Sequence, residues 1–174
     1  MRDALAAEPA LAASIREPAA PPLLAPLVSP PLTPDQAAGL DLILEGFLLH
    51  HGRPRQLDLA ERGRQVLAGD YCYAHGLVRV ADAGDLFVIE ALSDLISLGA
   101  GLAARGRTDA LAPLWRATAA AIAASAGPGP EADRAAERFL AAKRALRDGD
   151  DLGPLWPIAD ALPPTPGLEA ALTP

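Results

Sequence analysis

Aromatic residues are scarce in this sequence of 174 residues, which holds three phenylalanines, two tryptophans and two tyrosines. Hydrophobic residues make up 51% of the chain, and many of them are alanine or leucine. Aromatic and β-branched residues favour strands, whereas alanine and leucine favour helices, and small side chains let helices pack closely. We therefore expect an all-α fold, and the length is that of one domain with a sizeable core.

Positive charge and cysteine are also scarce. The 15 lysines and arginines are outnumbered by 22 aspartates and glutamates, so the net charge is −7. A protein that binds nucleic acid needs a basic patch to contact phosphates, so we expect no nucleic-acid partner. The single cysteine, Cys72, excludes an intrachain disulfide and an all-cysteine zinc site, and it fits a reducing cytoplasm.

Long hydrophobic runs are missing as well. No uninterrupted apolar stretch approaches the roughly 20 residues that a transmembrane helix needs. Asp3 and Glu8 interrupt the N-terminal segment where a signal peptide would have its apolar core. The sequence therefore predicts a soluble, cytoplasmic protein that does not span a membrane.

Proline marks the organisation of the chain. We divide it into an N-terminal segment with a proline-rich arm at 1–34, a helical domain at 35–149 and a C-terminal tail at 150–174. A short helix is expected within 1–17, and the arm, PAAPPLLAPLVSPPLTP, is expected to be extended because proline fixes φ and lacks an N–H. Its composition fits a strap over a hydrophobic surface and a mobile linker equally well. The tail is expected to hold a short helical turn and a loose end.

The helical domain is expected to be a small bundle of about five helices. Thr33-Pro34-Asp35 is typical of a helix start, because a capping hydroxyl precedes a proline and an acid. The apolar period and the breaks at HGRPR, Gly84-Asp85 and GPGP then predict helices at about 35–51, 57–81, 85–105, 109–126 and 131–148.

Asp70 is the residue that most resembles a site within these helices. A helical wheel of the second helix places Asp70 near the middle of its apolar arc. A buried carboxylate needs a partner. The candidates are a backbone group or an arginine of the cluster Arg53, Arg55, Arg62 and Arg64. No second catalytic group accompanies Asp70, so a structural role is favoured over a catalytic one. Gly69 and Gly76 lie at one edge of the arc and predict a neighbouring helix that crosses tightly.

Three other groups of residues have some features of a functional site. Glu90 and Asp94 are four residues apart and could hold a divalent ion, although such a pair is more often a solvated helix face. Cys72 and His75 have a spacing that suits zinc or a catalytic pair, but the neighbourhood offers no further ligand and no pocket. The arginine cluster could contact a diphosphate, or could only pair with nearby acids.

The segment VLAGDYCYAHGLVRVADAGDLFVIEALSDLISLGAG resembles part of the all-α trans-polyprenyl diphosphate synthases. It is most similar to the small, non-catalytic subunit of the two-component heptaprenyl diphosphate synthases. The resemblance covers about 62–105, with Gly69, Asp70 and Tyr71 in its motif, and FLLHHGRPR at 47–55 stands where the catalytic family has LIHDD. It implies a truncated, isoprenoid-synthase-like bundle in which the Gly-Asp pair serves helix packing.

The catalytic family holds magnesium and an allylic diphosphate through two DDxxD motifs, and this sequence has neither. His50 and His51 stand where the first motif would fall, and they point about 100° apart on a helix. The acidic cluster Asp148, Asp150 and Asp151 lacks the DDxxD spacing. The resemblance therefore implies no catalytic residue, no metal site and no cofactor in this chain.

The same resemblance implies a partner. This chain would pack against a catalytic polyprenyl diphosphate synthase subunit, which supplies the magnesium, and would help to shape the hydrophobic tunnel that sets product length. A hetero- or homo-oligomer is expected. Two alternatives remain at this point: a stand-alone helical protein that binds an isoprenoid or another apolar ligand, and an interaction scaffold without a ligand.

Overall fold

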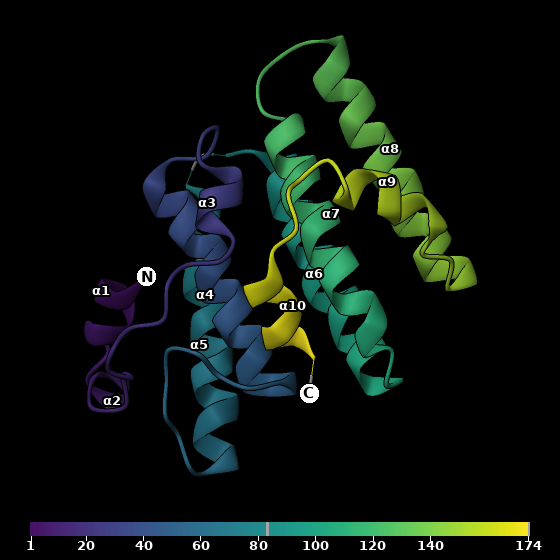
Figure 1. Ribbon diagram of the computed structural model, residues 1–174. Coiled ribbons are helices and arrows are strands. Elements are labelled where there is room, and N and C mark those ends of the chain that lie inside the picture. The colour runs from purple at the N-terminus through teal and green to yellow at the C-terminus, as the bar shows by residue number, and fades with distance from the viewer. Residues whose placement is uncertain (83, 174) are drawn as a thin grey trace.

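The computed structural model describes residues 1–82 and 84–173, and the described residues are helical, with no β-strand (Figure 1). Within these two ranges five helices are long, and they form the bundle: α4 (Pro34–His51), α5 (Arg62–Ala81), α6 (Leu86–Ala104), α7 (Leu111–Ala124) and α8 (Pro130–Gly149). The predicted all-α class is confirmed.

The starts of the long helices follow their capping residues. The Thr33 hydroxyl accepts from the backbone N–H of Gln36, and the Gln36 side chain accepts from the Thr33 N–H, which is a complete capping box for α4. Asp85 accepts from two backbone N–H groups at the start of α6. α5 begins at Arg62, five residues later than predicted, because 57–61 instead form a loop whose Leu57 and Leu59 are buried.

The two ends of the chain depart further from expectation. Pro9 starts a new helix, so the predicted helix within 1–17 is divided into α1 (Arg2–Ala6) and α2 (Pro9–Ala12). The arm is not extended throughout, because it contains the one-turn helix α3 (Ala25–Val28). In the tail, α9 (Trp156–Ala159) is followed by α10 (Pro166–Leu172), whose Leu168 and Leu172 are buried, so the tail is packed and has no loose end up to Thr173.

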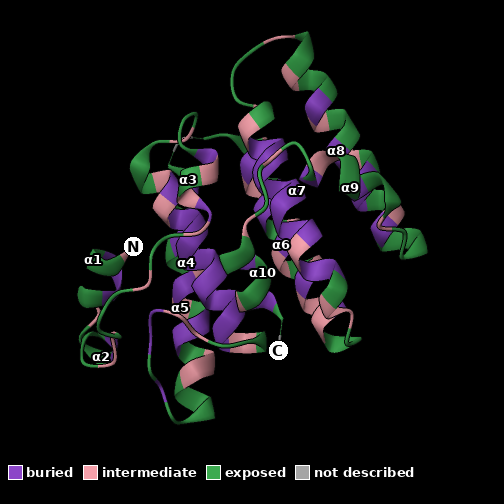
Figure 2. Ribbon diagram, viewed as in Figure 1, coloured by how far each residue is buried: buried purple, intermediate pink, exposed green. Residues whose placement is uncertain are grey.

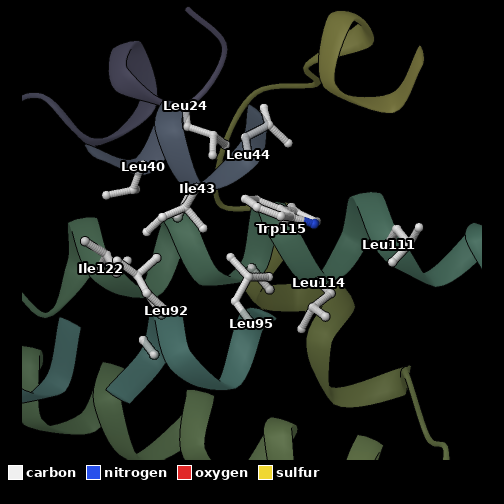
Figure 3. Close-up of a cluster of buried hydrophobic side chains, with 14 of the residues drawn as sticks. Leu24, Leu40, Ile43, Leu44, Leu92, Leu95, Leu111, Leu114, Trp115 and Ile122 are labelled. Atoms are coloured by element: carbon white, nitrogen blue, oxygen red, sulfur yellow. The ribbon is translucent and has the colours of Figure 1, made fainter. Parts of the chain in front are cut away.

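The core lies along α4 and α7, which are the most deeply buried long helices (Figure 2). Trp115 of α7 is the largest fully buried side chain, and its ring lies edge-on to Phe47 of α4, with the centroids 5.5 Å apart. Leucines and isoleucines of α4, α6 and α7 lie around Trp115, and Leu24 of the arm joins them (Figure 3). The arm and the tail therefore share one hydrophobic core with the long helices.

α6 corrects one expectation. It is 19 residues long with a mean hydropathy of 1.7 in its most apolar window, so by length and composition it is apolar enough to cross a membrane. Glu90 and Asp94 lie within this helix, so it is not an uninterrupted apolar run, but its average composition is more apolar than the sequence analysis expected. Core helices of soluble proteins pass the same test, although only 33% of this window is buried. The absence of a membrane span thus remains a prediction.

Candidate functional site

The VLAGDY motif lies at an unusually close contact between α4 and α5. The two helices are antiparallel and meet at two pairs of glycines, Gly39 with Gly76 and Gly46 with Gly69. A Cβ atom on Gly76 would lie 2.7 Å from the carbonyl oxygen of Gly39, and one on Gly46 would lie 3.0 Å from that of Gly69. Gly39 and Gly46 are seven residues apart in α4, and Gly69 and Gly76 are seven apart in α5, so the two glycines of each helix fall on one stripe. The tight crossing predicted from Gly69 and Gly76 is confirmed.

The buried face of α5 is not the one that the helical wheel gave. Its buried residues are small: Ala68, Gly69, Cys72, Gly76 and Val80. The larger apolar residues of the wheel lie beside this stripe or on the outer side of the helix. Close contact between two helices requires small side chains at its centre, so size and not hydrophobicity determined which face is buried.

Asp70 is consequently exposed, with 64% of its side chain accessible, and the prediction that it is buried is wrong. Its partner is not an arginine but His50 of α4, whose Nε2 lies 3.2 Å from Asp70 Oδ1. The contact is an ion pair when His50 is protonated, but its alignment is too poor for a hydrogen bond. Because the Asp70 carboxylate lies mostly in solvent, its charge is screened and the contact contributes little to stability.

Replacement of Asp70 by asparagine is therefore expected to change the free energy of unfolding by no more than about 0.5 kcal/mol. Asparagine keeps the shape and removes only a screened charge that lies in solvent. Urea unfolding of the purified variant measures this difference. A loss of several kcal/mol would show that the carboxylate is a structural element after all.

Aromatic rings extend from His50 into the core. His50 stacks on Tyr73 of α5 with the centroids 5.3 Å apart, and His51 lies 4.9 Å from Phe47. His50 Nε2 and the Tyr73 hydroxyl are buried, and neither has a hydrogen-bond partner among the described residues. Burial raises the pKa of Tyr73, so this hydroxyl stays protonated. The arrangement is a packed stack of rings and not a base poised beside a nucleophile.

Burial, the neighbouring His50 and then Arg62 lower the pKa of His51 below its ordinary value of 6.5. The unfolded chain therefore binds the proton more readily than the folded one. The contribution of His51 to stability is complete above pH 6.5 and is lost as the pH falls toward the folded pKa. We expect the stability of a His51→Gln variant to fall less steeply with acidification than that of the wild type. Denaturation series across this range measure both slopes, and parallel curves would contradict the prediction.

Two buried carboxylates that the sequence analysis missed lie on α4. Asp41 accepts from the backbone N–H groups of Leu23, Leu24 and Ala25 in the arm, at 2.8 to 3.1 Å. Glu45, one turn later, accepts from three successive N–H groups at 55–57, at 2.8 to 3.1 Å. Burial raises the pKa of Glu45, and the three N–H donors offset part of this effect. The signal available in the sequence was two acids, four residues apart, within the otherwise apolar stretch GLDLILEGF.

The arginine cluster holds segments of the chain together. Arg55 donates to the carbonyl oxygen of Pro21 in the arm, Arg62 donates to two carbonyl oxygens at the end of α4, and Arg64 donates to that of Ala10. Arg53 is exposed. None of the four reaches Asp70, whose partner is His50. Three of these side chains bind three different segments of the chain. They therefore do not converge on a common diphosphate site.

The other candidate site residues, Glu90 with Asp94 and Cys72 with His75, do not form a metal or catalytic site. Asp94 accepts from Lys143 Nζ of α8 at 2.6 Å and from Arg147 at 2.9 Å, and Glu90 lies 3.5 Å from the same Nζ. Asp94 thus pairs with a buried lysine, whereas Glu90 stays 60% exposed, as expected for a solvated helix face. Cys72 is fully buried, and burial raises the pKa of its thiol, while His75 is exposed. No group of three metal-ligating side chains occurs in the part of the chain that the structure describes.

The outer side of α5 and the start of α6 carry an apolar surface, which we call the α5–α6 patch. Leu67 and Val78 lie on the same outward stripe of α5 and are 71% and 59% exposed, and Leu86 at the first position of α6 is 77% exposed. Ala74 and Ala81 lie on the stripe of Leu67 and Val78 and are exposed as well. Three of the four large hydrophobic residues that the described structure exposes belong to this patch.

Comparisons of the chain with family models, with curated proteins and with solved structures find no match.

Proposed function

We propose that this chain is a non-catalytic subunit of an all-α polyprenyl diphosphate synthase, with a truncated, isoprenoid-synthase-like bundle. The observation that carries the proposal is the location of the α5–α6 patch. The patch lies on the two helices, 62–105, in which the sequence resembles the small subunits of such synthases. Exposed leucine and valine side chains on two successive helices are typical of a surface that another protein covers.

The glycine crossing supports the same proposal. Gly69 has the packing role that the resemblance implies for the Gly-Asp pair, since it lets α5 approach α4 closely. Tyr71 of the motif donates from its hydroxyl to the carbonyl oxygen of Ala4, so it anchors α1. Gly69 and Tyr71 thus serve structure, and the partner would supply the carboxylates and magnesium that the reaction needs.

Co-expression with a catalytic polyprenyl diphosphate synthase from the same genome tests the proposal. We expect the two chains to elute together, and Leu67→Glu with Val78→Glu to abolish the complex, because two charges would be buried unpaired at the interface. Trp156→Glu is the matched control, since Trp156 is also exposed but lies on α9. Elution as a separate monomer, or equal loss of binding in the control, would contradict the proposal.

A further inference from the structure

A cavity of about 450 Å³ lies between α7, α8 and the segment that contains α9. This volume falls within the range of about 300 to 1,000 Å³ that small-molecule sites occupy. Its wall is apolar apart from one arginine, and the small size of many lining residues leaves the space open: Ala120, Ala121, Ala124, Ala135, Ala141 and Ala161. None of the residues of the α5–α6 patch lines this cavity.

The cavity continues into a charged mouth. A second hollow of about 600 Å³ shares Ala124, Ala135 and Arg138 with the first, so the two form one groove. Arg134 joins Arg138 in this outer section, one helical turn earlier on α8. The groove therefore has an apolar inner section and a charged outer section, which is the division that an amphiphilic ligand requires.

The charge at the junction determines the sign of the head group. Arg138 is the one charged residue that lines both sections, whereas Glu131 and Glu137 line only the outer one. Neither Arg134 nor Arg138 takes part in an ion pair within the described residues. A head group that leaves the inner section first meets a guanidinium.

We infer that this groove binds a single-chain amphiphile with an anionic head: the chain lies along the alanines of α7 and α8, and the head is bound by Arg138 and Arg134. Guanidinium groups form strong, charge-assisted hydrogen bonds with both carboxylates and phosphates, so a fatty acid and a prenyl monophosphate share the required chemistry. The inference does not depend on the proposed function, because it uses a different surface.

Calorimetric titration of the full chain with oleate and with farnesyl monophosphate tests the inference and distinguishes the two sources. We expect saturable binding of at least one of them and about tenfold weaker binding to Arg138→Gln, since a charged hydrogen bond is lost. Ala124→Trp, which places a ring where both sections meet, should abolish binding. Glu137→Gln and Ala170→Trp are the controls, because they alter an outer glutamate and an exposed site on α10, and both should bind at least as tightly as the wild type.

Four results would overturn the inference. They are the absence of saturable binding of either anion, equal binding of oleyl alcohol or oleylamine, undiminished binding to both Arg138→Gln and Ala124→Trp, and a dimer in sedimentation that Ala124→Trp dissociates. Thermal unfolding of each variant shows whether it is folded. If Ala124→Trp does not fold, Ala161→Leu fills the same inner section from an exposed position and replaces it in the test.

Discussion

Replacing Gly76 with alanine is expected to lower the free energy of unfolding by about 2 kcal/mol, although alanine is the better helix former. The added Cβ would lie 2.6 Å from Ile43 Cγ1 and 2.7 Å from the carbonyl oxygen of Gly39. The second contact is with backbone, so α4 and α5 must separate to relieve it, and they would lose contacts along their length. Urea denaturation at constant pH measures the difference.

Gly63→Ala is the matched control within the same helix. A Cβ at Gly63 meets nothing within 4 Å. Alanine should therefore raise the free energy of unfolding by about 0.5 to 1 kcal/mol, because it lowers the conformational entropy of the unfolded chain and has the higher helix propensity. If Gly76→Ala is as stable as Gly63→Ala, the result would contradict the close contact between α4 and α5 at Gly76.

Replacing Asp41 with alanine is expected to destabilise the protein by about 3 kcal/mol, because three backbone N–H groups lose a charged acceptor in a buried position. The arm should detach locally, since these bonds hold the turn that places Leu24 and Val28 in the core. Hydrogen exchange at 23–25 measures the detachment, and denaturation measures the loss of stability.

Asp41→Asn and Asp35→Ala complete this test. Asparagine keeps one acceptor oxygen, so its cost should be intermediate, whereas Asp35 is exposed and its removal should cost little. Unchanged protection of the arm in Asp41→Ala would contradict this role of the carboxylate.

The sequence predicted the long helices well where their starts are local. The Thr33 capping box and the Asp85 cap involve only neighbouring residues, so α4 and α6 begin where the pattern indicates. The start of α5 could not be predicted in this way. Glu45 binds the N–H groups of 55–57, and this contact, which is distant in sequence, holds the following residues in a loop.

The position of Asp70 could not be predicted from hydrophobicity. A wheel gives the most weight to valine, leucine and tyrosine, but the helix contact is centred on Gly69 and Gly76, which such a scale treats as neutral. The two glycines mark the true contact face. Treating them as its centre would have placed Asp70 at the surface.

The arm illustrates a different limit. Its composition fits a strap and a linker equally well, and the structure shows a docked strap because Asp41 lies on the partner helix. The residue that decides between the two, Asp41, belongs to α4 and not to the arm. A lone acid within an apolar helix must be satisfied by some donor, but its sequence position does not say which segment supplies it.

The measurement that tests the central claim most directly is a prenyltransferase assay with magnesium, an allylic diphosphate and isopentenyl diphosphate. This chain, the co-encoded synthase and their mixture are assayed separately at equal concentrations. We predict no product from this chain alone, and from the mixture a higher rate or a longer product than from the synthase alone. Product formed by this chain alone, or a mixture that behaves as the synthase alone, would contradict the account.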